Sequence, residues 1–451
     1  MRGLAELGTQ PAWELVIGAL DDPRAEVADE AQWQLGWLEH PGVEKALYGK
    51  HGLGSRDAWV RVRVAEALGR MPLAVDTRRL LPKGARGDLA VSRTLLWSLE
   101  RRARAGRLGG DVLGLARKLE KLARGRGDPA LRADALATLT AVDVVRATAL
   151  LPHFEEDRDA RCRTAALVLG VELLDADQAL DMARRLAADE SDPVRAAAVI
   201  ALEDLGLREG LGLLVDRMET EPRRRTRRRA LEALQRLSGM KYRADPRPWR
   251  AWIAKQTPDW RPARADLAPA SSATAAFAGL PLLSDRIAFL IDFSGSLWTK
   301  REGRGTRKAA VDKALGEALP RLPEDTLFHI VPYTAVPHPW RDQLEPAKRR
   351  NIEQALEDFA DCRERGSGNA YGAIEYALAD PRVDTIVLLT DGAPTGGRRW
   401  KMDLIVQLLL FELRFRPVAI DLVLVDAPGG LARRWKAISA ATGGRAVEVS
   451  L

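Results

Sequence analysis

The feature that most constrains the fold of this chain is an internal repeat in its first half. The segment SDPVRAAAVIAL (residues 191–202) resembles GDPALRADALATL (127–139), RDARCRTAALVLG (158–170), DAWVRVRVAEAL (57–68) and RRTRRRALEAL (224–234). Each has an acid or turn residue, an apolar residue followed by arginine, and then alanine or leucine at helical spacing. The step is mostly about 32 residues, which is typical of two-helix solenoid repeats. The recurring arginines are Arg61, Arg93, Arg132, Arg163, Arg195 and Arg227.

The chemistry of the repeat explains why it forms helices that stack. Asp192 can cap a helix whose first residue is Pro193, and small residues such as Ala198 let two helices approach closely. One helix pair cannot bury its apolar face alone, so neighbouring pairs share a continuous core. The pattern resembles HEAT repeats, in the short bacterial form with the signature Asp-Pro-x-Val-Arg, over roughly residues 10–240. The resemblance implies an α-solenoid domain at 1–240, a class made up mostly of adaptors.

An arginine-rich segment, EPRRRTRRR, occupies residues 221–229 of the last repeat. Arg227 continues the repeat pattern, and we expect it to pair with an acid of the preceding repeat. The other arginines form either a solvated face or a basic patch for an anionic partner. We favour the solvated face, because runs of charge usually face water. The residues of the alternative partner patch are Arg223, Arg224 and Arg228.

Composition limits the class of protein. The chain has 451 residues, of which 46% are apolar and 29% charged, so we expect two or more domains of a soluble globular protein. The net charge of +7 permits contact with nucleic acid but does not argue for it. Two distant cysteines, Cys162 and Cys362, exclude a disulfide framework or a cysteine-based zinc site. We also expect no membrane span and no signal peptide, and therefore a cytoplasmic location.

A junction rich in tryptophan and proline separates the two halves, and we assign it to residues 241–276. Trp249 and Trp252 lie three residues apart and should share one helix face, with Trp260 close behind. Aromatic and basic residues together are also found in nucleic-acid platforms, but we favour a cap that closes the apolar end of the last repeat. The Ala/Pro/Ser-rich stretch at 261–276 is typical of a linker.

Strands and helices alternate in the C-terminal domain, at residues 277–451. The pattern predicts a doubly wound, mainly parallel, Rossmann-like α/β sheet with helices on both faces. Predicted strands are 286–292, 326–334, 383–392, 418–426 and 445–451, and predicted helices are 307–319, 347–360, 370–379, 404–413 and 431–443. Ligands of such sheets bind beyond the carboxyl ends of the strands.

Acids and hydroxyls follow two of these strands. Asp292, Ser294 and Ser296 alternate along an expected extended turn, and Asp391 follows a neighbouring strand. Oxygen ligands of this kind suit Mg²⁺. The arrangement resembles the von Willebrand factor type A (VWA) domain and its metal-ion-dependent adhesion site, with the pattern Asp-x-Ser-x-Ser, a Thr in a Gly-rich loop, and a later Asp. The resemblance implies that an acidic residue of a partner protein completes the shell of the ion.

The candidate site departs from the family pattern at one position. Gly368 occupies the place of the threonine and offers no side-chain oxygen. Ser367 or Asn369 could approach the metal instead, or a water could fill the gap. The loss of one ligand should weaken metal binding. The alternative is a degenerate site, in which the acids only cap turns and hold loops together.

Motifs of common enzymes are missing from the sequence. It has no phosphate loop of the Gly-x-x-x-x-Gly-Lys-Ser/Thr type, no His-Glu-x-x-His and no Gly-x-Ser-x-Gly elbow. A serine nucleophile in DFSGS would need a base nearby, and neither His329 nor His338 has an identifiable orienting acid. We therefore expect a protein that is not an enzyme and has no small-molecule substrate.

Three functional hypotheses remain. The leading one is an interaction scaffold, in which the solenoid offers an extended surface and a Mg²⁺ site captures an acidic residue of a partner protein. The second is a nucleic-acid-associated solenoid that uses its arginines. The third, implied by the VWA resemblance, is a cofactor that recruits an assembly or chaperone ATPase through the metal site.

Overall fold

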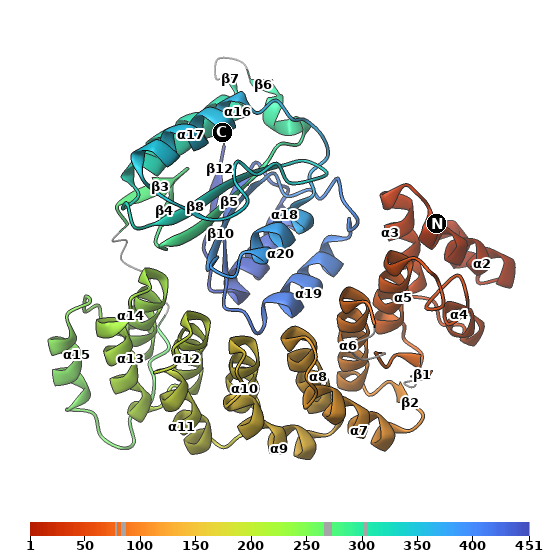
Figure 1. Cartoon of the computed structure of the whole chain (residues 1–451), viewed down its shortest axis with the longest axis horizontal. Helices are drawn as coiled ribbons and strands as arrows, with labels where there is room; N and C mark the ends of the chain where they lie inside the picture. The colour runs from red at the N-terminus through yellow and green to blue at the C-terminus, as the bar shows by residue number, and fades with distance from the viewer. Residues whose placement is uncertain (77–78, 83–86, 266–272, 302–304, 451) are drawn as a thin grey trace. The chain divides into compact units, whose positions relative to one another are not determined.

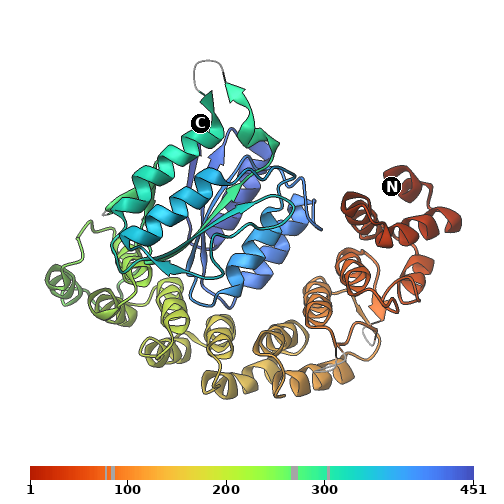
Figure 2. The ribbon, with the colours of Figure 1, turned by 45° about the horizontal axis from the view of Figure 1, so that its top comes forward.

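The computed structural model describes residues 1–76, 79–82, 87–265, 273–301 and 305–450. The chain divides into two compact units, Met1–Met182 and Ala183–Leu451 (Figures 1 and 2). The second unit contains the last helical repeats as well as the C-terminal sheet. None of the helices in the described ranges is both long and apolar enough to cross a membrane.

The first unit is a stack of short helices. Within it, α5, α6, α8 and α10 pack in sequence as one row, and α7 and α9 form the second row (Figure 1). This pairing confirms the predicted solenoid. The helices are α1 (Arg2–Leu7), α2 (Gln10–Gly18), α3 (Ala25–Leu35), α4 (Pro41–Leu47), α5 (Ala58–Arg70), α6 (Leu89–Arg104), α7 (Val112–Ala123), α8 (Pro129–Val142), α9 (Val144–Glu155) and α10 (Ala160–Leu173); α11 (Ala176–Leu186) crosses into the second unit.

The repeated acid is an N-cap. Asp57, Asp88, Asp128 and Asp159 precede α5, α6, α8 and α10, and each carboxylate accepts backbone N–H bonds from the first turn of its helix. These bonds satisfy amides that have no partner within the helix. The acid of the sequence repeat therefore sets where each helix of this row begins.

The repeated arginine ties down the loop in front of its own helix. Arg61, Arg163 and Arg195 each donate from Nη1 to the two carbonyls five and six residues earlier, at 2.7 to 3.0 Å. Arg227 follows the same pattern and donates to the carbonyl of Glu221 at 3.4 Å. The expected pairing of Arg227 with an acid side chain was therefore wrong, because its guanidinium serves the loop backbone.

The helical part of the second unit ends in a cap. It comprises α12 (Asp192–Leu205), α13 (Arg208–Thr220), α14 (Arg224–Ser238) and α15 (Pro246–Ile253). On α15, which packs on α13, Trp249 is fully buried and stands edge-on to Tyr242 with ring centroids 5.1 Å apart. The indole Nε1 of Trp249 donates to the carbonyl of Arg243 at 2.9 Å. This packing agrees with the cap that we favoured.

Part of the predicted linker is ordered along α14. The N–H groups of Ala263 and Ala265 donate to the carbonyls of Leu237 and Arg236 at 2.7 and 2.8 Å. These bonds use carbonyls at the C-terminus of α14 that have no partner within the helix. Residues 266–272 of the predicted linker lie outside the described residues.

A six-stranded sheet forms the core of the C-terminal domain. Its strand order is β12-β11-β10-β5-β8-β9, and every pairing is parallel except the one between β8 and the edge strand β9. The mainly parallel, doubly wound sheet is therefore confirmed. The strands are β5 (Arg286–Asp292), β8 (Leu327–Tyr333), β9 (Glu345–Pro346), β10 (Thr385–Thr390), β11 (Ala419–Val425) and β12 (Ala446–Val449).

Helices cover both faces of this sheet (Figure 2). Ile287, Phe289 and Ile291 of β5 share one apolar core with residues of α16 and α17, while α18, α19 and α20 lie on the other side. All residues of β10 and β11 are buried, as expected of strands covered on both faces. The helices are α16 (Arg307–Ala318), α17 (Arg349–Asp361), α18 (Ala370–Ala379), α19 (Met402–Leu413) and α20 (Gly429–Ala441).

Two short hairpins were not predicted. The strands β3 (Ala275–Phe277) and β4 (Leu280–Leu282) pair antiparallel, and Phe277 and Leu280 belong to the core of the domain. The strands β6 (Lys300–Arg301) and β7 (Gly305–Thr306) form a second pair. Strands of two or three residues are too short to show a period of two in the sequence.

Candidate metal centre

Asp292 is the last residue of β5, at the carboxyl edge of the sheet. Its side chain is 4% exposed. Its Oδ1 accepts the backbone N–H of Ser294 at 2.9 Å, and its Oδ2 accepts the hydroxyl of Thr390 at 3.0 Å. Thr390 ends the neighbouring strand β10, and its hydroxyl oxygen also accepts the N–H of Gly392 at 3.0 Å. Two adjacent strand ends therefore hold one carboxylate in place.

The environment of Asp292 opposes its ionisation. Burial raises the pKa of this carboxyl to about 6, and the negative charge of Asp391 adds to the rise, although hydrogen bonds from Ser294 and Thr390 oppose it. A buried carboxyl whose pKa is raised by burial and by the charge of a second acid is an arrangement that a bound cation would relieve.

Ser294 and Ser296 lie next to this carboxylate, but not on an extended turn. Ser294 precedes a 3₁₀ helix, Gly295–Trp298, which contains Ser296. The two hydroxyl oxygens are nevertheless 3.2 Å apart. The predicted conformation was wrong because the 3₁₀ turn closes the backbone, while the predicted meeting of the two hydroxyls does occur. Ser294 also forms an isolated parallel bridge with Gly366.

Asp391 directly follows β10 and is partly exposed. Its Oδ1 accepts the N–H of Ala393 at 3.3 Å. The next residue, Gly392, has a φ of 94°, and its carbonyl accepts the indole N–H of Trp435 at 3.1 Å. A left-handed glycine and a buried tryptophan therefore hold the turn that carries Asp391.

Gly368 lies against the carboxylate of Asp292. A β-carbon at Gly368 would stand 3.0 Å from Oδ1 and 3.1 Å from Oδ2. The N–H of Gly368 donates to the hydroxyl of Thr395 at 2.9 Å, and the N–H of Thr395 donates back to its carbonyl at 3.1 Å. The loop of the missing threonine thus reaches the candidate site, and Thr395 is a neighbouring hydroxyl that the sequence interpretation missed.

The two residues suggested as substitute ligands differ in their surroundings. Asn369 caps α18: its Oδ1 accepts the N–H of Gly372 at 3.0 Å, and its Nδ2 donates to the carbonyl of Ala335 at 2.9 Å. Its amide is therefore committed to holding the loop. Ser367 is partly exposed, and its side chain lies against Gly396 in the loop after β10.

Tyr333 is a second residue that the sequence interpretation missed. It pairs in register with Asp292 at the end of β8, and its side chain is fully buried. Burial raises the pKa of its hydroxyl, and the charge of Asp292 raises it further. The hydroxyl lies beside the side chains of Asp292 and Thr390 and interacts with both.

The donors at this edge are all oxygen atoms. Two carboxylates and two hydroxyls suit Mg²⁺, a hard cation, better than Zn²⁺, which is usually bound by nitrogen and sulfur ligands. Across the described ranges there is no group of three or more His, Cys, Asp or Glu residues that could hold a metal. Any cation here must therefore rely on the hydroxyls as well as the two carboxylates.

The arginines of the alternative partner patch are engaged within the second unit. Arg223 pairs with Asp192 and Asp285 at 2.6 and 3.3 Å. Arg224 donates to the hydroxyl of Thr326 at 2.9 Å and pairs with Asp325. Arg228 pairs with Glu232 at 2.7 Å on its own helix. The structure therefore corrects both earlier interpretations: two of these arginines bind the C-terminal domain rather than water or an open partner surface.

We considered two histidines, His329 and His338, as possible bases for the candidate serines. His329 is buried in the middle of β8, where burial lowers its pKa. His338 bonds through Nε2 to the hydroxyl of Thr334 at 2.8 Å. Neither is seen to bond to Ser294 or Ser296 in the described parts of the structure.

Comparisons with known proteins find similarity to HEAT repeats and to proteins with a von Willebrand factor A domain. A family model described as HEAT repeats matches residues 149–235. Human von Willebrand factor A domain-containing protein 3B is 29% identical over 164 residues, which are 36% of this chain and 12% of that protein. The chain contains HEAT repeats and is similar to proteins with VWA domains. Human inter-alpha-trypsin inhibitor heavy chain H4 is 30% identical over 131 residues, 26% of this chain and 13% of that protein.

The similarity is confined to a small part of each relative, because the chain matches 12 to 14% of the length of these curated proteins. Among solved structures, a von Willebrand factor type A protein from Catenulispora acidiphila is 17% identical, with a TM-score of 0.31. That match covers 38% of this chain and 40% of the other.

Proposed function

We propose that this chain is a non-enzymatic interaction protein whose VWA domain binds an acidic side chain of a partner protein with the help of Mg²⁺. The residues that would hold the cation are Asp292, Ser294, Ser296 and Asp391. When bound, the cation supplies a positive charge and an open coordination position for a carboxylate. The stacked helices of the HEAT repeats would add an extended scaffold surface.

The observation that carries the proposal is the state of Asp292. It is buried at the carboxyl edge of a parallel sheet, its pKa is raised, and two hydroxyls 3.2 Å apart follow it in the chain. A carboxylate placed only to cap a turn would not need a second acid close enough to raise its pKa.

The absence of the usual threonine should make this a weak metal site. Gly368 contributes no oxygen, and Asn369 is committed to capping α18. The hydroxyl of Thr395 and that of Ser367 are the remaining candidates in the two loops that meet here. We therefore propose millimolar rather than micromolar dependence on Mg²⁺.

The nucleic-acid alternative has less support. It requires arginines that are available to phosphates, and Arg223 and Arg224 are paired with acids of the C-terminal domain. The recruitment of an assembly ATPase would use the same metal site as the leading proposal. It differs only in the identity of the acidic partner.

The test is a pulldown from cell extract with the full chain, in Mg²⁺ and in EDTA. We expect a partner that is retained in Mg²⁺, lost in EDTA and lost with Asp292→Ala. The matched control is Asp358→Ala, an exposed aspartate on α17, which should retain the partner. A partner indifferent to EDTA and to Asp292→Ala, yet released by moderate salt, would sink the proposal and favour nucleic acid, whose binding falls steeply with salt.

A further inference from the structure

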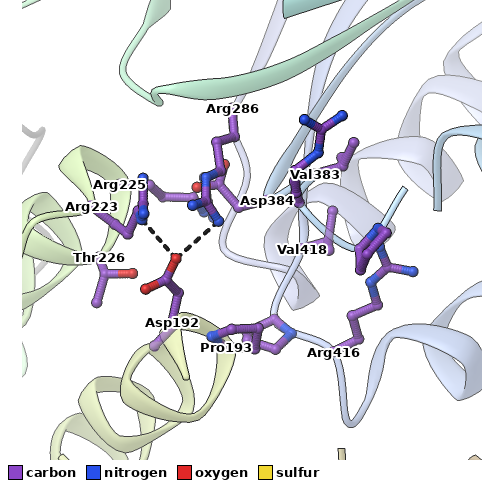
Figure 3. Close-up of a pocket in the computed structure, with 14 residues that line it drawn as sticks. Asp192, Pro193, Arg223, Arg225, Thr226, Arg286, Val383, Asp384, Arg416 and Val418 are labelled. Carbon is purple, nitrogen blue, oxygen red and sulfur yellow. Dashed lines mark hydrogen bonds and ion pairs between the residues drawn. The ribbon is translucent and has the colours of Figure 1, made fainter. Parts of the chain in front are cut away.

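A small pocket with charged and apolar side chains in its lining lies at the opposite end of the sheet from Asp292 (Figure 3). It is bounded by the start of β5, by the residues just before β10 and β11, and by α12 and α14, all within the second unit. Its volume is about 40 Å³. Since one water needs roughly 10 to 15 Å³ measured in this way, the pocket has room for only a few water-sized groups.

Positive charge dominates the lining of this pocket. Its arginines are Arg223, Arg225, Arg286, Arg382 and Arg416. The acids of the lining are only Asp192 and Asp384. The lining therefore has more positive than negative side chains, although Arg382 and Arg416 also bind Asp380 and nearby backbone carbonyls.

Asp192 is already shared among three arginines. It pairs with Arg195 and Arg223 at 2.6 Å each and with Arg286 at 2.9 Å (Figure 3). Asp384 accepts the hydroxyls of Ser284 and Thr385 at 2.5 and 2.8 Å. Among the described residues, neither Asp192 nor Asp384 forms an ion pair with Arg225, which lines the pocket from α14.

Among the arginines of this pocket, Arg225 is the one whose charge is least neutralised by nearby acids. Its Nη2 donates to the carbonyls of Thr442 and Gly443 at 3.5 and 3.2 Å, and among the described residues it forms no ion pair. Burial lowers the pKa of its guanidinium, although Asp421 and Asp384 partly oppose the effect. A second cavity, of about 30 Å³, also has Arg225 in its wall. A buried guanidinium with this little compensation is unfavourable unless an anion approaches it.

Arg286 offers another open donor to the same pocket. Its Nη1 binds Asp192, but its Nε is buried and has no partner in the described part of the chain. Two guanidinium groups, one on α14 and one on β5, thus line one small space, and that of Arg286 has a buried N–H without a partner in the described part of the chain. Guanidinium groups bind tetrahedral oxyanions through paired N–H bonds.

We propose that this pocket binds a small oxyanion of the size of inorganic phosphate, held by Arg225 and Arg286. The volume excludes a nucleotide or a peptide from the pocket itself. Because the two arginines belong to the last HEAT helix and to the first strand of the sheet, the bound anion would also join these two elements. This site is independent of the metal centre at the other end of β5.

The proposal is tested by equilibrium dialysis of the full chain against labelled inorganic phosphate at constant ionic strength. We expect one saturable site per chain, and binding weakened by at least roughly tenfold in Arg225→Gln, which removes a charge-assisted donor pair. Arg225→Lys keeps the charge but loses the fork and should be intermediate. The control is Arg247→Gln, because Arg247 is exposed and pairs only with Asp245.

Thermal melts separate this site from a general effect of salt. In chloride, Arg225→Gln should melt close to the wild-type temperature, because it removes both the burial cost of the guanidinium and its attraction to Asp384 and Asp421. In phosphate at equal ionic strength, only the wild type and Arg247→Gln should gain stability. Phosphoserine as the added ligand should give a smaller gain, since the ester group does not fit; an equal gain would assign the pocket to phosphate groups carried on a larger molecule. Absence of saturable binding, or equal binding by Arg225→Gln, overturns the proposal.

Discussion

Gly368 and Asp292 are packed so closely that a β-carbon at position 368 would stand 3.0 Å from the carboxylate of Asp292. The missing threonine is therefore more than a lost ligand. Asp292 rests, through its bonds to Ser294 and Thr390, in space that a side chain at 368 would need. The observed position of the Asp292 carboxylate therefore favours a residue without a side chain at position 368.

This contact predicts opposite effects of Gly368→Thr in the absence and presence of metal. Without metal, the variant should be less stable by about 1 to 3 kcal/mol, because Asp292 must move from its hydrogen bonds. With Mg²⁺, the restored hydroxyl should give a larger increase in melting temperature than the wild type shows. Gly368→Ala is the control: it adds the β-carbon without the oxygen, so it should lose stability and gain no more from Mg²⁺ than the wild type does.

The dependence of stability on pH should carry a contribution from Asp384. Burial raises the pKa of this carboxyl to about 6, even though Arg225, Ser284 and Thr385 lower it. Because the folded pKa is above that of the unfolded chain, the contribution is favourable below about pH 4 and is lost as the pH rises through 6. Asp384→Asn should therefore be more stable than the wild type at pH 7, by about 3 kcal/mol at most. Denaturant unfolding at pH 4 and pH 7 measures this, and an equal difference at both values would contradict it.

Arg195, the arginine of the repeat at residues 191–202, should be critical for folding. Arg195 binds Glu221 through Nε and Nη2 at 2.9 and 3.0 Å, and Glu221 is 1% exposed. Arg195→Met removes the closest cation from this buried carboxylate and leaves it Arg217 at 3.8 Å, so the variant should lose about 3 kcal/mol of unfolding free energy. The double variant Arg195→Met, Glu221→Leu should recover much of that loss. If the double variant were as unstable as the single one, the loop carbonyls rather than the ion pair would be the main contribution of Arg195.

The cap of the last helix pair depends on Trp249. This side chain is fully buried and meets Tyr242 edge-on. Trp249→Ala should cost about 3 to 5 kcal/mol, and Trp249→Phe less, because it loses mainly the bond to the carbonyl of Arg243. Trp252→Ala is the comparison, since Trp252 is only partly buried and should cost less. Denaturant midpoints of the three variants check this order.

Local patterns made much of this fold predictable. The helix 370–379 was placed at its observed bounds, since α18 is Ala370–Ala379, and the other sheet helices were placed to within a few residues. Continuous apolar runs predicted the buried strands β5 and β10, and the parallel rule then put Asp292 and Asp391 at one edge. Hairpins of two or three residues per strand carried no comparable signal.

The sequence by itself determined that the first half stacks as helical repeats and that the second half is a doubly wound sheet with acids and hydroxyls at its carboxyl edge. It did so because capping acids, helical spacing and strand runs act over a few neighbouring residues. Only the tertiary structure decided that Arg223 and Arg224 bind acids of the C-terminal domain, that Arg225 has no ion pair among the described residues, and that Gly368 lies against Asp292. These contacts depend on which residues, distant in the sequence, packing brings within a few ångströms of one another. The local sequence around an arginine or a glycine does not indicate which distant residue it contacts.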